Sequence, residues 1–126
     1  MSPLQPKELM GNNIVRDKSF GFALRIVKLY RYLKEEKKEY VLSKQVLRSG
    51  TAIGALVRES QHAESKADFI HKLSIALKEA NETEYWSELL FQSEYLEHRS
   101  YQSIHTDIEE LLKLLTSIIK TTKENK

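Results

Sequence analysis

Two acid–histidine pairs are the residues whose types and spacing could bind a metal: Glu59 with His62, and Asp68 with His71. Both have the spacing of the Glu-x-x-His motifs that, with two further Glu residues, hold the metals of di-iron four-helix bundles. Here both pairs flank one expected turn, and the acidic residues of the segment 17–38 lie only at its ends. The sequence therefore predicts no metal and no cofactor, and a metal-dependent enzyme is the least favoured function.

The rest of the sequence carries no catalytic signature. The chain has no cysteine, which excludes disulfides and thiolate chemistry. Its four glycines never form a GxGxxG pattern, and no arrangement of Ser, His and Asp stands out. His98 and His105 flank an expected helix boundary, where we expect them to face solvent. The sequence therefore predicts a protein that is not an enzyme.

The apolar residues recur every three or four positions over four segments, which is the period of an amphipathic helix. We expect helices at residues 17–38, 43–60, 66–97 and 102–122, with N-caps at Ser43, Ser65 and either Ser100 or Ser103. Short connections make sequential helices antiparallel, so the predicted fold is an all-α, up-down-up-down four-helix bundle. We expect one domain, 1–126, in which residues 1–13 form a poorly ordered arm that holds both prolines.

Charge is distributed unevenly along a chain whose net charge is only +2. Residues 16–38 hold eight Lys or Arg against three acids, whereas residues 79–110 hold nine acids against Arg99 alone. The basic segment could contact nucleic-acid phosphates. The interpretation that we favour is that it meets the acidic third helix, within one chain or across an interface. The candidate nucleic-acid contacts are Lys18, Arg25, Lys28, Arg31 and Lys34.

The first expected helix is apolar on nearly all sides. In FGFALRIVKLYRYL, residues 20–33, the polar stripe consists of Arg25, Lys28 and Arg31, with Gly21 and Tyr32 extending it. A helix that is apolar all round is usually buried all round. One side can pack into the bundle, and the other side needs a second cover. We favour self-association as that cover over burial under the N-terminal arm.

The second expected helix contains an unusual run of small residues, LRSGTAIGALVRES, in which Gly50 and Gly54 lie one turn apart. Each glycine costs about 1 kcal/mol against alanine inside a helix. Small side chains let another helix backbone approach closely and gain dispersion contacts. The run therefore predicts a close helix crossing, either within the bundle or between copies.

Charged and aromatic residues surround this run. Arg48 and Glu59 are eleven residues apart, about three turns, so they point nearly the same way. Antiparallel packing places Arg48 level with Glu82, and we expect a charge-assisted contact between them. Trp86 could anchor an interface or fill a groove. The residues assigned a structural or interface role are Arg48, Ser49, Gly50, Gly54, Glu59, Glu82 and Trp86.

A long stretch of the sequence resembles the bacterial four helix bundle proteins, also described as proteins encoded by intervening sequences of the large-subunit ribosomal RNA gene and sometimes labelled ribosomal proteins. The stretch is residues 47–90, LRSGTAIGALVRESQHAESKADFIHKLSIALKEANETEYWSELL. Its carrying elements are Arg48-Ser49-Gly50, Glu59, SKADF and SIALKEANETEYW. FGFALRIVKLY also fits the opening segment of the family, although Leu56 stands where the family commonly carries Asn.

The resemblance implies a small bundle that assembles as a homopentamer and has no assigned chemistry. In a related branch, the accessory proteins of diversity-generating retroelements, a basic pentamer binds nucleic acid and the reverse transcriptase. We therefore predict a non-enzymatic, self-assembling scaffold or accessory protein, with RNA or DNA binding through the basic face of the first helix as the alternative. No segment has the apolar core of a signal peptide or the length of a membrane span, so we expect a cytoplasmic protein without a membrane partner.

Overall fold

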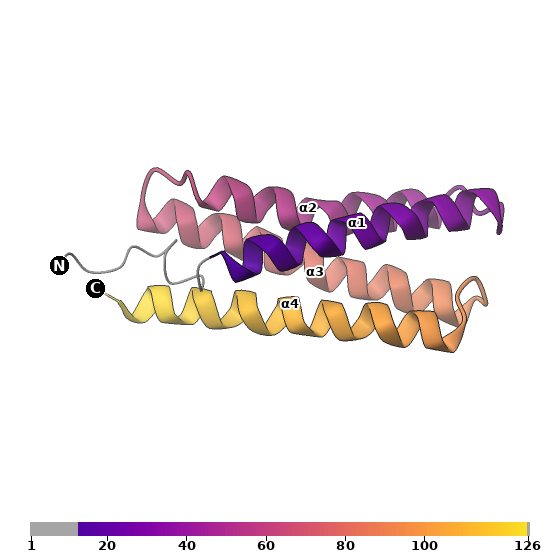
Figure 1. The fold of residues 1–126 in the computed structure, drawn as a ribbon. Coiled ribbons are helices and arrows are strands. Elements are labelled where there is room, and N and C mark those ends of the chain that lie inside the picture. Colours follow the sequence, from indigo (N-terminus) through magenta and orange to yellow (C-terminus); the bar gives the residue numbers. More distant parts are fainter. Residues whose placement is uncertain (1–12, 126) are drawn as a thin grey trace.

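Four α-helices make up the structure, a computed structural model that describes residues 13–125. They are α1 (Ile14–Glu35), α2 (Leu42–Ser60), α3 (Lys66–Gln92) and α4 (His98–Glu124). Each helix runs antiparallel to the one before it (Figure 1), which confirms the predicted all-α, up-down-up-down four-helix bundle. Residues 1–12, nearly all of the predicted arm, lie outside the described residues.

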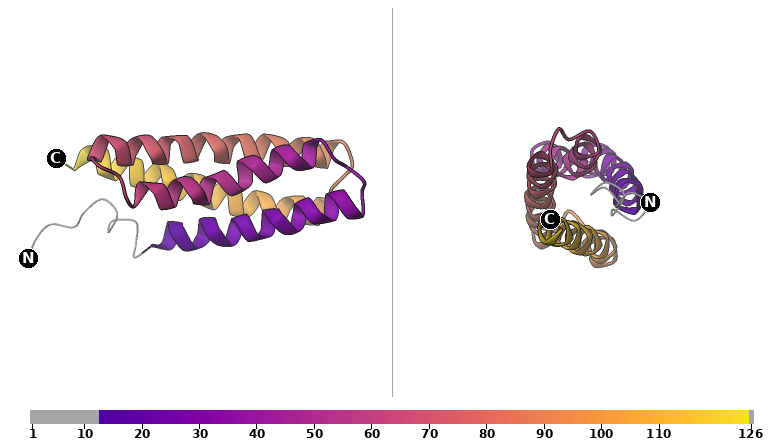
Figure 2. Two further views of the ribbon diagram at one scale, coloured as in Figure 1. Left: turned by 90° about the horizontal axis from the view of Figure 1, so that it is seen from above. Right: turned by 90° about the vertical axis from the view of Figure 1, so that its left-hand side faces the viewer.

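The helices pack in chain order around one core. α1 packs along α2, α2 along α3 and α3 along α4, whereas α1 and α4 contact each other at fewer positions. Viewed end-on in Figure 2 (right), the four helices form an arc with α1 and α4 at its two ends. The core consists of one buried apolar side from each helix, with residues Val15, Phe22, Ile26, Leu29, Leu33, Val46, Ile53, Val57, Phe69, Leu73, Ala76, Ala80, Leu90, Ile104, Ile108, Leu111, Leu115, Ile118 and Ile119.

The turn between α1 and α2 corrects two predictions. α1 ends at Glu35 instead of residue 38, because Lys38 has a left-handed backbone (φ 54°) that cannot continue a right-handed helix. Ser43 lies inside the first turn of α2 and is not its N-cap. Its backbone N–H donates to the Glu39 carboxylate at 2.7 Å, and its hydroxyl donates to the Glu39 carbonyl oxygen at 2.8 Å. Glu39, only 8% exposed, therefore does the capping that the sequence assigned to Ser43.

The end of α3 also differs from the prediction, since the helix stops at Gln92 and not at residue 97. A Schellman motif terminates it: the Tyr95 N–H donates to the Leu90 carbonyl oxygen at 2.8 Å, and the Glu94 N–H donates to that of Phe91 at 3.0 Å. Glu94 has the left-handed backbone (φ 70°) that this motif requires. Glycine usually occupies that position, so its absence hid the helix end in the sequence.

The beginnings of α3 and α4 give opposite outcomes for the predicted caps. Ser65 caps α3 as predicted, because its hydroxyl oxygen accepts the Asp68 N–H at 3.0 Å. α4 begins at His98, four residues before the prediction, and ends at Glu124 instead of residue 122. Ser100 and Ser103 therefore lie inside the helix, and neither is its cap.

Candidate assembly interface

The two glycines of α2 lie where α1 crosses that helix within one bundle. A Cβ atom at Gly50 would stand 2.7 Å from Cγ1 and 2.9 Å from Cγ2 of Ile26, a fully buried residue. A Cβ atom at Gly54 would stand 3.2 Å from the backbone oxygen of Ser19. The predicted close crossing is confirmed, and it lies between α1 and α2 of the same chain.

A polar network joins α2 to α3 on the surface. Nη2 of Arg48 donates to Oε1 of Glu82, so the contact predicted between these residues is confirmed. Nη1 of Arg48 lies 3.2 and 3.3 Å from the two carboxylate oxygens of Glu79, and the Trp86 indole N–H donates to Oε1 of Glu82 at 3.0 Å. The hydrogen bonds from Trp86 and Arg48 lower the pKa of Glu82, and the bond to Glu82 raises the pKa of Arg48. This network fixes the register of α2 against α3.

Two further residues of the predicted set contribute to the same seam. The Ser49 hydroxyl is fully buried and lies 2.9 Å from the Thr83 hydroxyl, which is itself 2.7 Å from the Glu79 carbonyl oxygen. Glu59 lies nearer the other end of α2, where Lys72 donates to its carboxylate at 3.3 Å. All of these contacts lie within one chain, so they position α2 and α3 and leave the outer sides of the bundle free to act as interfaces.

One such outer side belongs to α1. Six exposed residues with helical spacing form it, and we call this set the α1 outer face: Asp17, Phe20, Gly21, Leu24, Lys28 and Arg31. Phe20 is 49% exposed and Leu24 is 52% exposed. The Arg58 guanidinium lies 5.0 Å from the centroid of the Phe20 ring. The face is therefore acidic at Asp17, apolar from Phe20 to Leu24 and basic at Lys28 and Arg31. This order matches the prediction that α1 has apolar residues beyond those facing the core.

The candidate nucleic-acid residues divide into two groups. Lys18 pairs with Glu110 at 3.1 Å, while Arg25 pairs with Asp107 and donates to the Ser103 hydroxyl at 2.9 Å. Both partners lie on α4, so the prediction that basic α1 meets acidic α3 within one chain is wrong. α1 and α4 approach each other at the two ends of the arc of helices, so these basic residues of α1 pair with α4. These pairs lie within one chain and do not test the prediction of a contact between α1 and α3 of different chains.

The second group of basic residues is not ion-paired in the part of the chain that the structure describes. Lys28, Arg31 and Lys34 form no ion pair with any residue between 13 and 125. Lys34 instead places its ammonium 5.6 Å from the centroid of the Tyr30 ring. Three of the five candidate nucleic-acid contacts therefore keep an uncompensated charge within the described part of the chain.

The acid–histidine pairs lie around the α2–α3 turn, as expected. Glu59 pairs with Lys72, and the Asp68 carboxylate accepts the Glu64 backbone N–H at 3.2 Å. Over residues 13–125, no three His, Asp or Glu side chains gather in a way that could hold a metal ion. The residues present therefore serve the turn and the start of α3.

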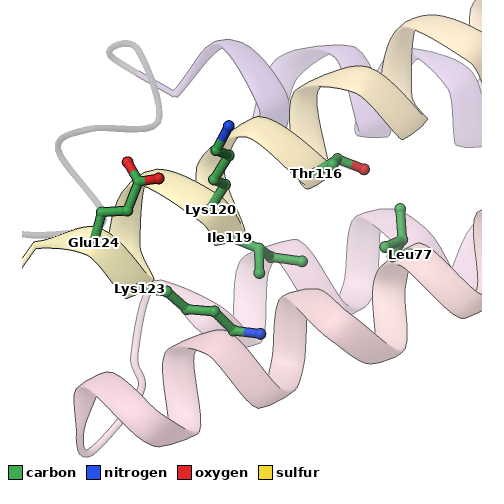
Figure 3. Close-up of a pocket in the computed structure, with 6 residues that line it drawn as sticks. All are labelled: Leu77, Thr116, Ile119, Lys120, Lys123 and Glu124. Carbon is green, nitrogen blue, oxygen red and sulfur yellow. The ribbon is translucent and has the colours of Figure 1, made fainter.

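A shallow groove of about 430 Å³ lies between α3 and α4. Figure 3 shows Leu77 and Ile119 facing the space between the two helices. The other lining residues are Thr116, Lys120, Lys123 and Glu124, all of them exposed. Exposed side chains of this kind do not form the enclosed, convergent lining that fixes a ligand in one orientation, so we assign the groove no role.

The fold and its outer faces define a class of protein: a small all-α bundle whose polar contacts hold its own helices together. Within that class, the chain belongs to the 23S rRNA-intervening sequence protein family, whose model matches residues 11–117. The resemblance found in the sequence is thereby confirmed. In the described part of the chain, no helix is long and apolar enough to cross a bilayer.

One solved structure supports the same family and fold. It is the 1.70 Å crystal structure of a protein of unknown function from the S23 ribosomal protein family of Bacteroides thetaiotaomicron. The two chains share 62% sequence identity with a TM-score of 0.85, over 86% of this chain and 96% of that one. No curated protein matches the sequence. The comparisons thus supply a family and a fold, and they leave the activity open.

Proposed function

We propose that this protein is a non-enzymatic scaffold or accessory module that assembles with copies of itself through the α1 outer face. The exposure of Phe20 and Leu24 carries the proposal, because the opposite side of the same helix already lies in the core. Fully burying a side chain of this type contributes about 1.5–3 kcal/mol. About half of each side chain remains to be buried, and the gain recurs at every contact in an assembly.

The shape of the face supports the proposal. Gly21 lies between the two apolar residues, and no atom of the described residues stands within 4 Å of a Cβ atom built there. A second chain could therefore approach the α1 backbone closely, in the way that α2 approaches it at Gly54. A pentamer is the assembly that the family resemblance implies, and it would contain five copies of the 14.7 kDa chain.

The native mass of the wild type and of Leu24→Gln, measured by light scattering, tests this proposal. We expect a discrete oligomer for the wild type and a smaller species for the variant, with unchanged helicity. Val41→Gln is the matched control, because it removes a 70% exposed apolar side chain from the α1–α2 turn. A monomeric wild type, or equal loss of mass in both variants, would contradict the proposal.

Nucleic-acid binding is a second candidate function, supported by the uncompensated charges of Lys28, Arg31 and Lys34. Phosphate contacts by these residues would make the affinity fall with salt. Because Lys28 and Arg31 belong to the α1 outer face, this function is an alternative to assembly through that face. The test is fluorescence anisotropy with labelled RNA and DNA, comparing Lys28→Ala/Arg31→Ala with the control Lys120→Ala/Lys123→Ala on α4. Affinity lost equally in both double variants, or no affinity at low salt, would reject this function.

A further inference from the structure

We propose that the α1 outer face of one copy docks on the outer side of α3 in the next copy, head to tail and with the two helices parallel. The inference rests on the proposed self-assembly and names the surface that receives the α1 outer face. We call that surface the α3 outer face and define it by four exposed residues: Lys78, Asn81, Tyr85 and Glu88.

Tyr85 is the apolar centre of the α3 outer face. Its side chain is 58% exposed, and its ring meets the Trp86 ring edge-on at 5.0 Å between centroids. Trp86 is itself tied to Glu82, so the Tyr85 ring rests on an ordered neighbour. Exposed aromatic residues supported in this way are common anchors of protein interfaces. Within residues 13–125, no other large apolar side chain of α3 has this exposure.

The charges on the two faces match in only one relative direction. From N- to C-terminus, the α1 outer face presents acidic Asp17, apolar Leu24 and basic Lys28. In the same order, the α3 outer face presents a basic residue, an apolar residue and an acidic residue, namely Lys78, Tyr85 and Glu88. The first two members are seven residues apart on both helices, about two turns.

The relative direction of the two helices follows from this order. When Leu24 opposes Tyr85 and the helices are parallel, Asp17 lies level with Lys78, and Lys28 lies level with Glu88. In the antiparallel arrangement about the same central pair, each end brings like charges together, which disfavours docking. Lys28, Lys78 and Glu88 form no ion pair with another described residue, so each keeps its charge for a partner.

The topology of the bundle agrees with the parallel arrangement. α1 and α3 run in the same direction within one chain and are separated by α2 (Figures 1 and 2). A rotation about an axis along the bundle keeps all copies pointing the same way, so α1 of one copy would be parallel to α3 of the next. Because the two faces are different surfaces, the contact is heterologous, and its repetition closes a ring or extends a filament.

The electrostatic surroundings of α3 support a basic partner. The pKa of Tyr101 is raised by burial and by the nearby carboxylates of Glu88, Glu84 and Glu109. Glu84 and Glu88 lie on either side of Tyr85 in the sequence, so the C-terminal part of the α3 outer face is acidic, whereas the C-terminal part of the α1 outer face is basic. Complementary potentials of this kind set the register of an interface more than its affinity.

Cysteine cross-linking tests the docking, and the chain offers a clean background because it has no cysteine. Three variants are treated with a short bismaleimide under native conditions: Leu24→Cys, Tyr85→Cys, and the double variant. A heterologous contact predicts no cross-link in either single variant and a ladder longer than a dimer in the double variant. Leu24→Cys with Tyr40→Cys is the control, since Tyr40 is similarly exposed but lies in the α1–α2 turn, and it should give no ladder.

Each other outcome counts against the inference in a distinct way. A dimer of Leu24→Cys alone would show a two-fold contact between α1 faces, and a ladder in the control would show cross-linking without specificity. No ladder in a protein whose untreated wild type is oligomeric by light scattering would overturn the docking and leave the proposed self-assembly intact. A monomeric wild type would overturn both.

Charge exchange gives an independent measurement of the same contact. Lys28→Glu and Glu88→Lys should each weaken assembly, whereas the double exchange should restore the wild-type mass at the same protein concentration. Lys120→Glu on α4 is the control for a charge reversal elsewhere and should leave the mass unchanged. Two weakened single variants without recovery in the double variant would contradict the pairing of these residues.

Discussion

Replacing Gly50 by alanine tests the helix crossing that positions α1. Alanine favours the helix by about 1 kcal/mol over glycine. Against this gain, the new Cβ atom would stand 2.7 and 2.9 Å from two carbons of Ile26, closer than carbon atoms can approach. Ile26 is fully buried, so relief requires a shift of the core, and overpacking of this kind costs about 1–3 kcal/mol. We expect a net loss of about 1 kcal/mol in the free energy of unfolding.

Gly21→Ala is the matched control for this prediction. It adds the same methyl group to α1, but no atom of the described residues of the same copy lies within 4 Å of the new atom, so the single chain should retain the gain of about 1 kcal/mol. Urea unfolding followed by circular dichroism, at a protein concentration low enough to keep the chains apart, measures both variants. In an Ile26→Ala background, the loss caused by Gly50→Ala should largely disappear. Equal stability of Gly50→Ala and Gly21→Ala would contradict the expected clash with Ile26.

Three further predictions concern the caps and the polar seam. Glu39→Ala should lower the free energy of unfolding by about 0.5–2 kcal/mol, while the exposed control Glu36→Ala should change it by less than about 0.5 kcal/mol in the same urea titration. Thr83→Val leaves the buried Ser49 hydroxyl without its hydrogen-bond partner and should lower the free energy of unfolding by about 1–3 kcal/mol in that assay. An unchanged free energy of unfolding would contradict the importance of this hydrogen bond. Because the pKa of Glu82 is lowered on folding, its stabilisation should be complete above the ordinary value of 4.5 and be lost as the pH falls below it. Thermal melts across this range should show a weaker acid dependence for Glu82→Gln than for the wild type, and identical profiles would contradict the assignment.

Most of the fold could be predicted because it depends on local pattern. The spacing of residues such as Ile104, Ile108 and Leu111 places them on the buried side of α4, and Ser65 with Asp68 marks the start of α3. The ends of α1 at Glu35 and of α3 at Gln92 could not be predicted in the same way. Lys38 and Glu94, which follow them, adopt a left-handed backbone, and a sequence indicates that conformation only where glycine or asparagine is present.

The candidate site shows the same division between local and long-range information. The contact between Arg48 and Glu82 follows from antiparallel packing of neighbouring helices, so it could be predicted from the sequence. Lys18 pairs with Glu110, and Arg25 pairs with Asp107. Both pairs depend on how α1 and α4, the first and last helices of the arc, approach each other in three dimensions. Charge pattern alone identifies an acidic partner and does not say which acidic helix provides it. The capping of α2 by Glu39 was not predicted, because Ser43 lies close to the start of that helix and serine is a commoner N-cap than glutamate.

The native mass of Gly21→Gln, measured beside the wild type, tests self-assembly most directly. This substitution adds a side chain to the centre of the α1 outer face, where no atom of residues 13–125 lies within 4 Å of a Cβ atom, so it should not disturb the fold. We expect a wild-type mass that is a multiple of 14.7 kDa, and for the variant a shift toward the mass of the single chain with full helicity. A monomeric wild type, or a variant that assembles as well as the wild type, would contradict it.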